Sequence, residues 1–208
     1  MKKSLTSLTT LFILALGCSP HTGVGSQDKK PENRSAPTEP ASATTPADAE
    51  PSRQAQAMKG LRDRLLTSSP KEIGLSGKDA KAKVWGVLME VGIPKGIATL
   101  VSLRDGTVSL YTSTGGGILG GYSARKEGKR FVLEAEKHLA SMKPEKSFPY
   151  AEVGRMKFYV LTQEGVYTAE ADEKEVLSEQ HALLPLFLAG NEVLTVLRIA
   201  NERVKPDD

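Results

Sequence analysis

A β-hairpin signal near the middle of the chain constrains the fold more than any other sequence feature. Residues 97–103, IATLVSL, form a nearly continuous apolar run, which is typical of a buried strand. Asp105 and Gly106 follow, and this dipeptide favours a tight hairpin turn because glycine adopts a positive φ at no steric cost. Residues 107–113 then alternate, with Val108, Leu110 and Thr112 on one face and Ser109 and Tyr111 on the other. The sequence therefore predicts two antiparallel strands joined at this turn.

A second hairpin is predicted further along the chain. Residues 157–162, KFYVLT, predict a third strand, and Gln163-Glu164-Gly165 supplies a turn. Residues 166–171 then run back as a fourth strand. Together the two hairpins predict a central antiparallel sheet of about four strands in an α+β fold.

Two helices are predicted before the first hairpin. A short amphipathic helix is indicated by the spacing of Met58, Leu61, Leu65 and Leu66, before a break at Ser68-Ser69-Pro70. A second helix is expected to begin at an N-cap on Ser76 and to end near Gly92. Its apolar positions recur at helical spacing: Ala80, Val84, Val87, Leu88 and Val91.

Two more helices are expected, one between the hairpins and one after them. One runs to about Met142, with Phe131, Ala135 and Leu139 along one side. The last apolar segment, residues 181–200, favours a single long helix, because a glycine inside a helix costs only about 1 kcal/mol. The alternative is a turn at Gly190-Asn191 followed by a fifth strand, in which Val193, Thr195, Leu197 and Ile199 alternate. The expected order is helix, hairpin, helix, hairpin, helix.

The N-terminus has the pattern of an export signal. Lys2 and Lys3 precede a short apolar run at residues 11–16, which ends at Gly17 and Cys18. The sequence ALGC resembles the lipobox of bacterial lipoproteins, although Ala15 and Leu16 stand in the reverse of the usual order. This resemblance implies removal of residues 1–17 and attachment of lipid to Cys18, which is the only cysteine. Ser19 follows the cysteine, and in two-membrane bacteria this implies the outer membrane, facing the periplasm. An ordinary secretory signal with a stray thiol is the alternative.

Composition divides the remaining chain in two. Residues 18–53 are dominated by proline, alanine, serine and threonine and contain no aromatic residue, which predicts a disordered linker. Residues 54–208 are long enough to bury one core and are predicted to form a single globular domain. The chain has 28 basic and 25 acidic residues, so loss of Lys2 and Lys3 leaves a nearly neutral protein. Nothing in this balance indicates nucleic-acid binding.

Two further resemblances concern the globular part. The order of elements over residues 78–200 resembles the roadblock, longin and profilin-like folds. The blocks VWGVLMEVG, DGTVSLYTSTGGGILGG, KFYVLT, GVYT and LLPLFLAGNEVLTVLR resemble those of a family of uncharacterised bacterial proteins. Neither resemblance implies an activity. Roadblock-like modules pair with one another, which implies a homodimer by analogy.

The glycine-rich segment after the first hairpin is the main candidate for a binding site. Ser113, Thr114, Gly115, Gly116 and Gly117 are expected to lie between a strand and a helix, where backbone N–H groups and the helix dipole attract anions. The P-loop and dinucleotide-binding spacings are absent, however. A steric interpretation is favoured, in which these glycines allow a positive φ or close backbone contact.

The other polar clusters are expected to be solvated surface. They are the basic group Arg125, Lys126, Lys129 and Arg130 and the acidic group Glu170, Asp172, Glu173 and Glu175. His138 and His181 show no zinc-binding spacing, so neither a metal nor a cofactor is predicted. His138 is expected to be a half-buried core residue, and His181 a surface or capping residue. Tyr111, Tyr159 and Tyr167 are expected on faces of the sheet, where either a partner or a helix covers them.

These patterns lead to three functional hypotheses. The leading one is a lipid-anchored interaction or scaffold module of the cell envelope, without catalytic activity, that contacts the membrane through Cys18. The second is a sensor that binds a small ligand or an anion at Ser113 to Gly117. The third is a hydrolase, which would need a site assembled around His138 or His181, and no G-x-S-x-G motif supports it.

Overall fold

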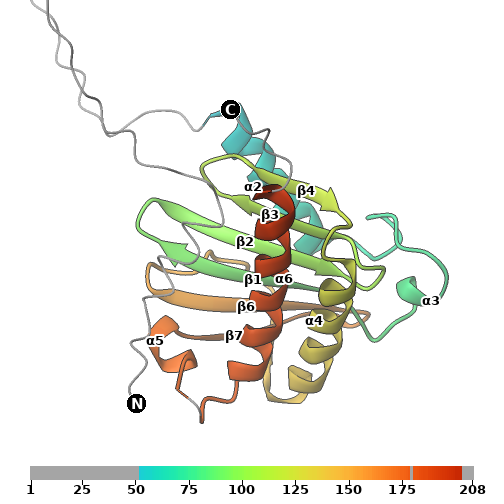
Figure 1. The fold of residues 1–208 in the computed structure, drawn as a ribbon. Helices are drawn as coiled ribbons and strands as arrows, with labels where there is room; N and C mark the ends of the chain where they lie inside the picture. Colours follow the sequence, from blue (N-terminus) through green and yellow to red (C-terminus); the bar gives the residue numbers. More distant parts are fainter. Residues whose placement is uncertain (1–51, 179, 203–208) are drawn as a thin grey trace, which may run out of the picture.

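The computed structural model describes residues 52–178 and 180–202, and its centre is a seven-stranded antiparallel sheet (Figure 1). The strands are β1 (Val84–Ile93), β2 (Gly96–Leu103), β3 (Val108–Thr112), β4 (Gly117–Gly121), β5 (Lys143–Glu145), β6 (Arg155–Thr162) and β7 (Gly165–Asp172). The helices are α2 (Arg53–Thr67), α3 (Gly77–Ala80), α4 (Arg125–His138), the 3-10 turn η1 (Leu139–Ser141), α5 (Glu173–Val176) and α6 (Leu184–Glu202). The signal, Cys18 and most of the predicted linker lie outside the described residues.

The strands are arranged in the order β4-β3-β2-β1-β6-β7-β5. The two predicted hairpins are confirmed as β2–β3 and β6–β7, and their inner strands β2 and β6 flank β1 at the centre. The prediction of about four strands is wrong, although the α+β class holds. Three strands were missed: β1, β4 and β5.

The central strand β1 occupies most of the segment that was predicted to be a helix. Only α3 is helical there, and Ser76 makes no side-chain cap hydrogen bond. A register shift between Val84 and Gly86 brings Val84 onto the same face as Val87 and Val91. Because of this irregularity, valines three and four positions apart share one face, which imitates a helical period. Both faces of β1 are buried, so no alternation of polar residues reveals the strand.

The flanking strands β4 and β5 were missed for different reasons. Three of the five residues of β4 are glycine, a residue depleted in strands, and the segment was interpreted as a loop leading into a helix. Strand β5 has only three residues and contains Pro144. Proline is tolerated at a sheet edge because it has no N–H to donate to a ladder. The formation of both strands therefore depends more on pairing with the neighbouring strands than on their own residue types.

The helix predicted before Met142 and the long final helix are both confirmed. Helix α4 continues into η1, and its buried residues include Phe131 and Ala135. Helix α6 passes through Gly190 without a break, so the alternative of a fifth strand there is wrong. A Cβ atom at Gly190 would lie 2.9 Å from the sulfur of Met89. The glycine therefore allows α6 to approach the central strand closely.

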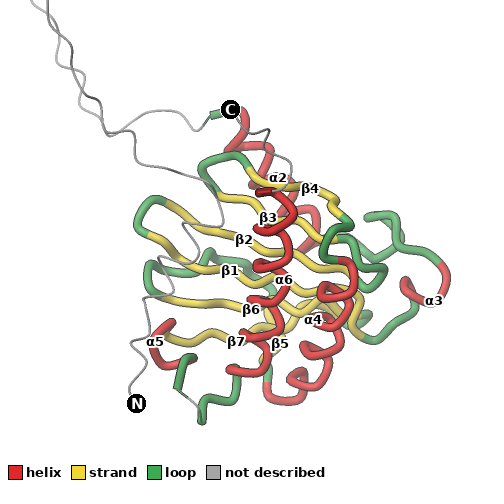
Figure 2. Tube along the Cα trace, in the orientation of Figure 1, coloured by secondary structure: helices red, strands yellow, loops and turns green. Residues whose placement is uncertain are grey.

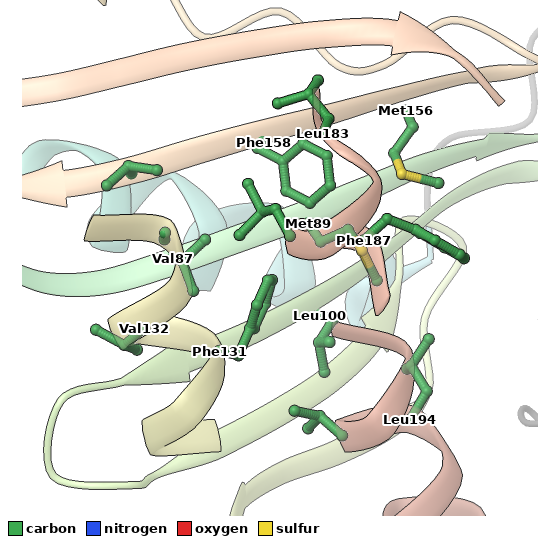
Figure 3. Packing of buried hydrophobic residues seen from close by; sticks show 14 of the residues in the cluster. Val87, Met89, Leu100, Phe131, Val132, Met156, Phe158, Leu183, Phe187 and Leu194 are labelled. Carbon is green, nitrogen blue, oxygen red and sulfur yellow. The ribbon is translucent and has the colours of Figure 1, made fainter. Parts of the chain in front are cut away.

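The sheet has a hydrophobic core on each face. Helices α4 and α6 pack against each other and cover one face (Figure 2), where Met89, Leu100, Phe131, Phe158 and Phe187 meet (Figure 3). The opposite face is covered by α2 and by residues 68–83. Its core consists mainly of Leu66, Leu75, Ala80, Trp85, Leu88, Val101, Leu103, Tyr111, Tyr159 and Leu161.

Candidate functional site

The predicted binding loop is a hairpin turn between β3 and β4. Gly115, Gly116 and Gly117 all have positive φ angles, of 104°, 84° and 143°. The expectation that a helix follows this loop is wrong, because α4 begins only at Arg125, after β4. No helix dipole is therefore directed at the glycines. The binding of an anion or ligand by Ser113 to Gly117 stays a prediction, without the helix terminus on which it was based.

Hydrogen bonds within the molecule use several polar groups of this turn. The hydroxyl oxygen of Ser113 accepts from the backbone N–H of Ile97 at 2.9 Å. The hydroxyl of Thr112 donates to the carbonyl of Gly115 at 2.7 Å, and it lies 3.1 Å from the hydroxyl of Thr114. These contacts join the turn to β2 and stabilise its shape.

Close approach explains two of the three glycines. A Cβ atom at Gly117 would lie 2.2 Å from the carbonyl oxygen of Leu110, and one at Gly115 would lie 2.8 Å from the Cβ of Gln54 in the first turn of α2. At Gly116 a Cβ atom would meet nothing within 4 Å. The steric role expected for these glycines therefore fits positions 115 and 117, where α2 and β3 pass closely.

Strand β4 forms an uncharged edge of the sheet. Its sequence, GILGG, has no ionisable side chain, and among the described residues it pairs only with β3. Leu119 is 50% exposed, and Tyr122, directly after the strand, is 60% exposed. An edge strand presents unpaired N–H and C=O groups that can pair with another chain. Within the described part of the chain, this edge therefore combines an unpaired side of the strand with exposed apolar side chains.

The opposite edge has the features that prevent such pairing. Strand β5 is three residues long, and Lys143, Pro144 and Glu145 make up its whole length. Short length, charge and proline all protect a sheet edge against association. The two edges of the same sheet thus differ in length, charge and proline content, although the register of β4 with β3 shifts between Val108 and Leu110.

A row of polar side chains crosses the sheet on the face beneath α2. Register pairs join Tyr111 to Thr99, Thr99 to Glu90, Glu90 to Lys157, and Lys157 to Glu170. The row therefore spans β3, β2, β1, β6 and β7. At the β4 end it meets Gly117, the register partner of Tyr111.

The centre of this row is a buried ion pair between α2 and β1. Arg62 donates to Glu90 through Nε at 2.5 Å and through Nη2 at 3.0 Å. Its Nη1 donates to the carbonyl of Phe148 at 2.9 Å, and its guanidinium lies 4.1 Å from the ring centre of Tyr150. Desolvation raises the pKa of Glu90, which is fully buried, and Arg62 opposes this shift. The geometry attaches α2 to the middle of the sheet.

Sequence analysis missed this pair, although one signal was present. Glu90 interrupts the apolar run VWGVLMEVG, and a carboxylate within a buried strand requires a partner. Arg62 lies 28 positions earlier, on a helix that is recognisable in the sequence only by its apolar residues. Only the fold brings the two side chains together.

Tyr111 ends the row with a buried hydroxyl. In the part of the chain that the structure describes, this oxygen has no hydrogen-bond partner. Desolvation raises the pKa of the phenol far above its usual range, with a smaller contribution from Glu90. The tyrosine is therefore a neutral side chain of the second core. Tyr111 and Tyr159 both lie on the face that α2 covers. For these two residues, the expectation of a covering helix is therefore confirmed, and not the alternative of a partner.

The histidines lie on separate elements. His138 is half-buried at the end of α4, as expected, and its Nε2 is 3.3 Å from the carboxylate of Glu134. The Nδ1 of His181 accepts from the backbone N–H of Leu183 at 3.2 Å, just before α6. Because α6 begins at Leu184, this bond lies before the helix, and the expected capping role of His181 stays a prediction.

The acidic group predicted at the end of the second hairpin is distributed over β7 and α5. Glu170 accepts from Arg155 at 3.0 Å and pairs with Lys157 at 3.1 Å, and its pKa is lowered because these hydrogen bonds outweigh desolvation. Asp172 caps α5, and Glu173 is buried, so the expectation of a solvated edge is wrong for Glu173. Within the described ranges, no three His, Cys, Asp or Glu side chains are placed to hold a metal ion.

A shallow depression of about 360 Å³ lies near α3 and α4. Its lining residues are Lys78, Asp79, Ala82, Arg104, Lys129 and Leu133. Arg104 is already paired with Glu136 at 2.8 Å. Lys129, from the predicted basic group, contributes to this surface and not to the glycine turn.

Comparison with known proteins found no matching family model, curated protein or solved structure. Among residues 52–178 and 180–202, no helix is both long enough and apolar enough to cross a membrane.

Proposed function

We propose that this protein is a non-enzymatic interaction module of the cell envelope, held at the outer membrane by lipid on Cys18, which binds an extended protein segment along β4. The contrast between the two sheet edges carries this proposal. Strand β4 has an open, uncharged edge with Leu119 exposed, whereas β5 is short, charged and contains proline. Strand addition uses main-chain hydrogen bonds for affinity and side-chain contacts for specificity.

The polar row supports this function indirectly. The Arg62–Glu90 pair and the close contact of Gln54 with Gly115 attach α2 to the sheet beside β3 and β4. A strand that binds another chain has to keep its own shape, because ordering a flexible edge on binding costs free energy. The turn hydrogen bonds of Thr112 and Ser113 hold this edge in place.

Photo-crosslinking in cells tests the role of the edge. A photoreactive amino acid at Leu119 is expected to give a discrete protein adduct. The same group at Leu133, which is similarly exposed (46%) but lies on α4, is expected to give none. Equal labelling patterns at the two positions would contradict the proposed role of β4.

Metabolic labelling tests the anchor separately. The full chain is expected to incorporate labelled fatty acid and to sediment with membranes, and Cys18→Ala is expected to abolish both. Unchanged labelling of Cys18→Ala would refute the lipid attachment, whatever the result at β4.

A further inference from the structure

We propose that the sheet face beneath α2 carries a binding site for an arginine side chain, which Arg62 fills from within the molecule. The ligand that this site fits is an amphipathic helix presenting an arginine, as α2 does, so a partner helix of this kind competes with α2 for the sheet. The site is separate from the edge at β4, and neither proposal depends on the other.

The groups that bind the guanidinium all lie outside α2. The carboxylate of Glu90 on β1 accepts from Nε of Arg62 at 2.5 Å and from Nη2 at 3.0 Å. The carbonyl oxygens of Phe148 and Pro149 accept from Nη1 at 2.9 Å and from Nη2 at 3.4 Å. Together these acceptors bind all three nitrogen atoms of the guanidinium.

Two aromatic rings complete the site. The guanidinium carbon of Arg62 lies 4.1 Å from the ring centre of Tyr150 and 5.4 Å from that of Tyr159. A guanidinium is planar, carries its donors in a fixed fork and stacks on aromatic faces, whereas an ammonium is a compact point charge. The combination of a carboxylate bound at two points, two carbonyls and two rings therefore selects arginine over lysine.

Contacts that do not involve α2 hold the loop before β6 in place. The hydroxyl of Tyr159 donates to the carbonyl of Pro149 at 2.5 Å, and the rings of Phe148 and Tyr159 meet edge to face at 5.9 Å. The backbone N–H of Gly154 donates to the carbonyl of Gly92 at 3.0 Å, which joins the end of this loop to β1. The acceptors therefore remain in position when the arginine is removed, and such preorganisation favours binding.

The buried carboxylate determines which occupant the face favours. The side chain of Glu90 is 0% exposed, and a buried carboxylate without a partner is costly. Its register neighbour Lys157 pairs instead with Glu170 at 3.1 Å. Without an arginine, Glu90 therefore lies without its cation on the face of the second core. A helix that supplies an arginine fits this face better than a purely apolar one.

Helix α2 is suited to be a replaceable occupant. It lies at the start of the described chain, and it buries Arg62 and Leu66, while its remaining residues are partly or fully exposed. The ladders of the sheet join strands alone, so they persist when α2 leaves. A terminal element with few buried side chains is among the first to open locally.

Chemical rescue tests the site itself. The full chain with Arg62→Ala is heated with millimolar n-propylguanidinium, which supplies the missing group. The compound is expected to raise the thermal midpoint of this variant by several degrees, because it binds the folded chain. The ammonium analogue, n-propylammonium, has the same charge and is expected to give little, and neither compound is expected to shift the wild type. Equal effects of the two cations on Arg62→Ala would overturn the arginine site.

Peptide binding tests the competition between helices, and it does not require Arg62→Ala to fold. A labelled peptide of residues 52–68 is expected to bind the wild-type full chain. It is expected to bind the Arg62→Ala chain about tenfold or more tightly, since the competing α2 then lacks its arginine. Matched peptides carry Arg64→Ala, at an exposed position, which is expected to bind equally, and Arg62→Ala, which is expected not to bind. Failure of the unmodified peptide to bind either chain, or equal binding of the Arg62→Ala peptide, would overturn the proposal.

Discussion

At the scale of single residues, the consecutive glycines at positions 115–117 have three different environments. Gly117 lies against the backbone of β3, Gly115 lies against α2, and Gly116 faces open space. The same residue type is therefore required by packing at two positions and only by its positive φ at the third. The sequence alone does not distinguish the three glycines, because the residues that surround them come from distant parts of the chain.

Substitution by asparagine should separate these roles. Gly116→Asn is expected to lower the free energy of unfolding by about 1 kcal/mol or less, because asparagine tolerates a positive φ. Gly117→Asn is expected to lower it by about 3 kcal/mol or more, since a Cβ there meets the carbonyl of Leu110 and strain alone costs about 1–3 kcal/mol.

Urea unfolding followed by the fluorescence of Trp85 measures both changes. Trp85 is the only tryptophan, and its Nε1 donates to the carbonyl of Thr162 at 3.0 Å within the second core. Equal losses at the two positions would show that the close approach of β3 is not what requires Gly117. Because Gly116→Asn is expected to preserve the fold, it is also the variant with which to test ligand binding at the turn.

At the scale of elements, local signals predicted the two hairpins and the long helices but not the central strand β1 or the two edge strands. The two hairpins, α4 and α6 follow from turn residues and periodicity. Strand β1 does not follow from such signals, because its register shift and the burial of both its faces remove the alternation that identifies a strand. Strand β4 does not either, because three of its five residues are glycine. The Arg62–Glu90 pair depends on β1 and was therefore missed with it.

Helix α2 buries Arg62 and Leu66, and Met58 and Leu65 pack against the same core, so both the ion pair and apolar contacts attach it to the sheet. Arg62→Met is expected to lower the free energy of unfolding by about 3–5 kcal/mol, since Glu90 then stays buried without its partner. The double variant Arg62→Met, Glu90→Met is expected to recover most of that loss. Arg155→Met, which breaks a more exposed pair with Glu170, is expected to cost about 1 kcal/mol or less.

Chemical denaturation of these variants provides the measurement, again through Trp85. If Arg62→Met is no less stable than Arg155→Met, the Arg62–Glu90 pair does not hold α2 on the sheet. A double variant no more stable than Arg62→Met would mean that its loss is due to packing of the arginine side chain and not to an unpaired charge.

At the scale of the whole molecule, two cores share one sheet. The face beneath α4 and α6 and the face beneath α2 are separated only by the strands, and β1 contributes side chains to both. Neither core can lose its packing without disturbing strands on which the other depends.

Thermal unfolding is therefore expected to be a single cooperative transition. The fluorescence of Trp85 reports on the α2 face, and far-ultraviolet circular dichroism reports on all helices and strands. Their midpoints are expected to coincide, as in a two-state transition. An earlier midpoint for Trp85 fluorescence would show instead that the α2 face unfolds as a separate unit.

The contact between Gln54 and Gly115 places the first described residue, Ser52, close to the turn that leads into β4. On the lipid-anchor proposal, the tether to Cys18 therefore leaves the domain beside the turn that leads into β4. A segment bound along β4 lies near the start of this tether, and its distance from the membrane is limited by the length of the tether.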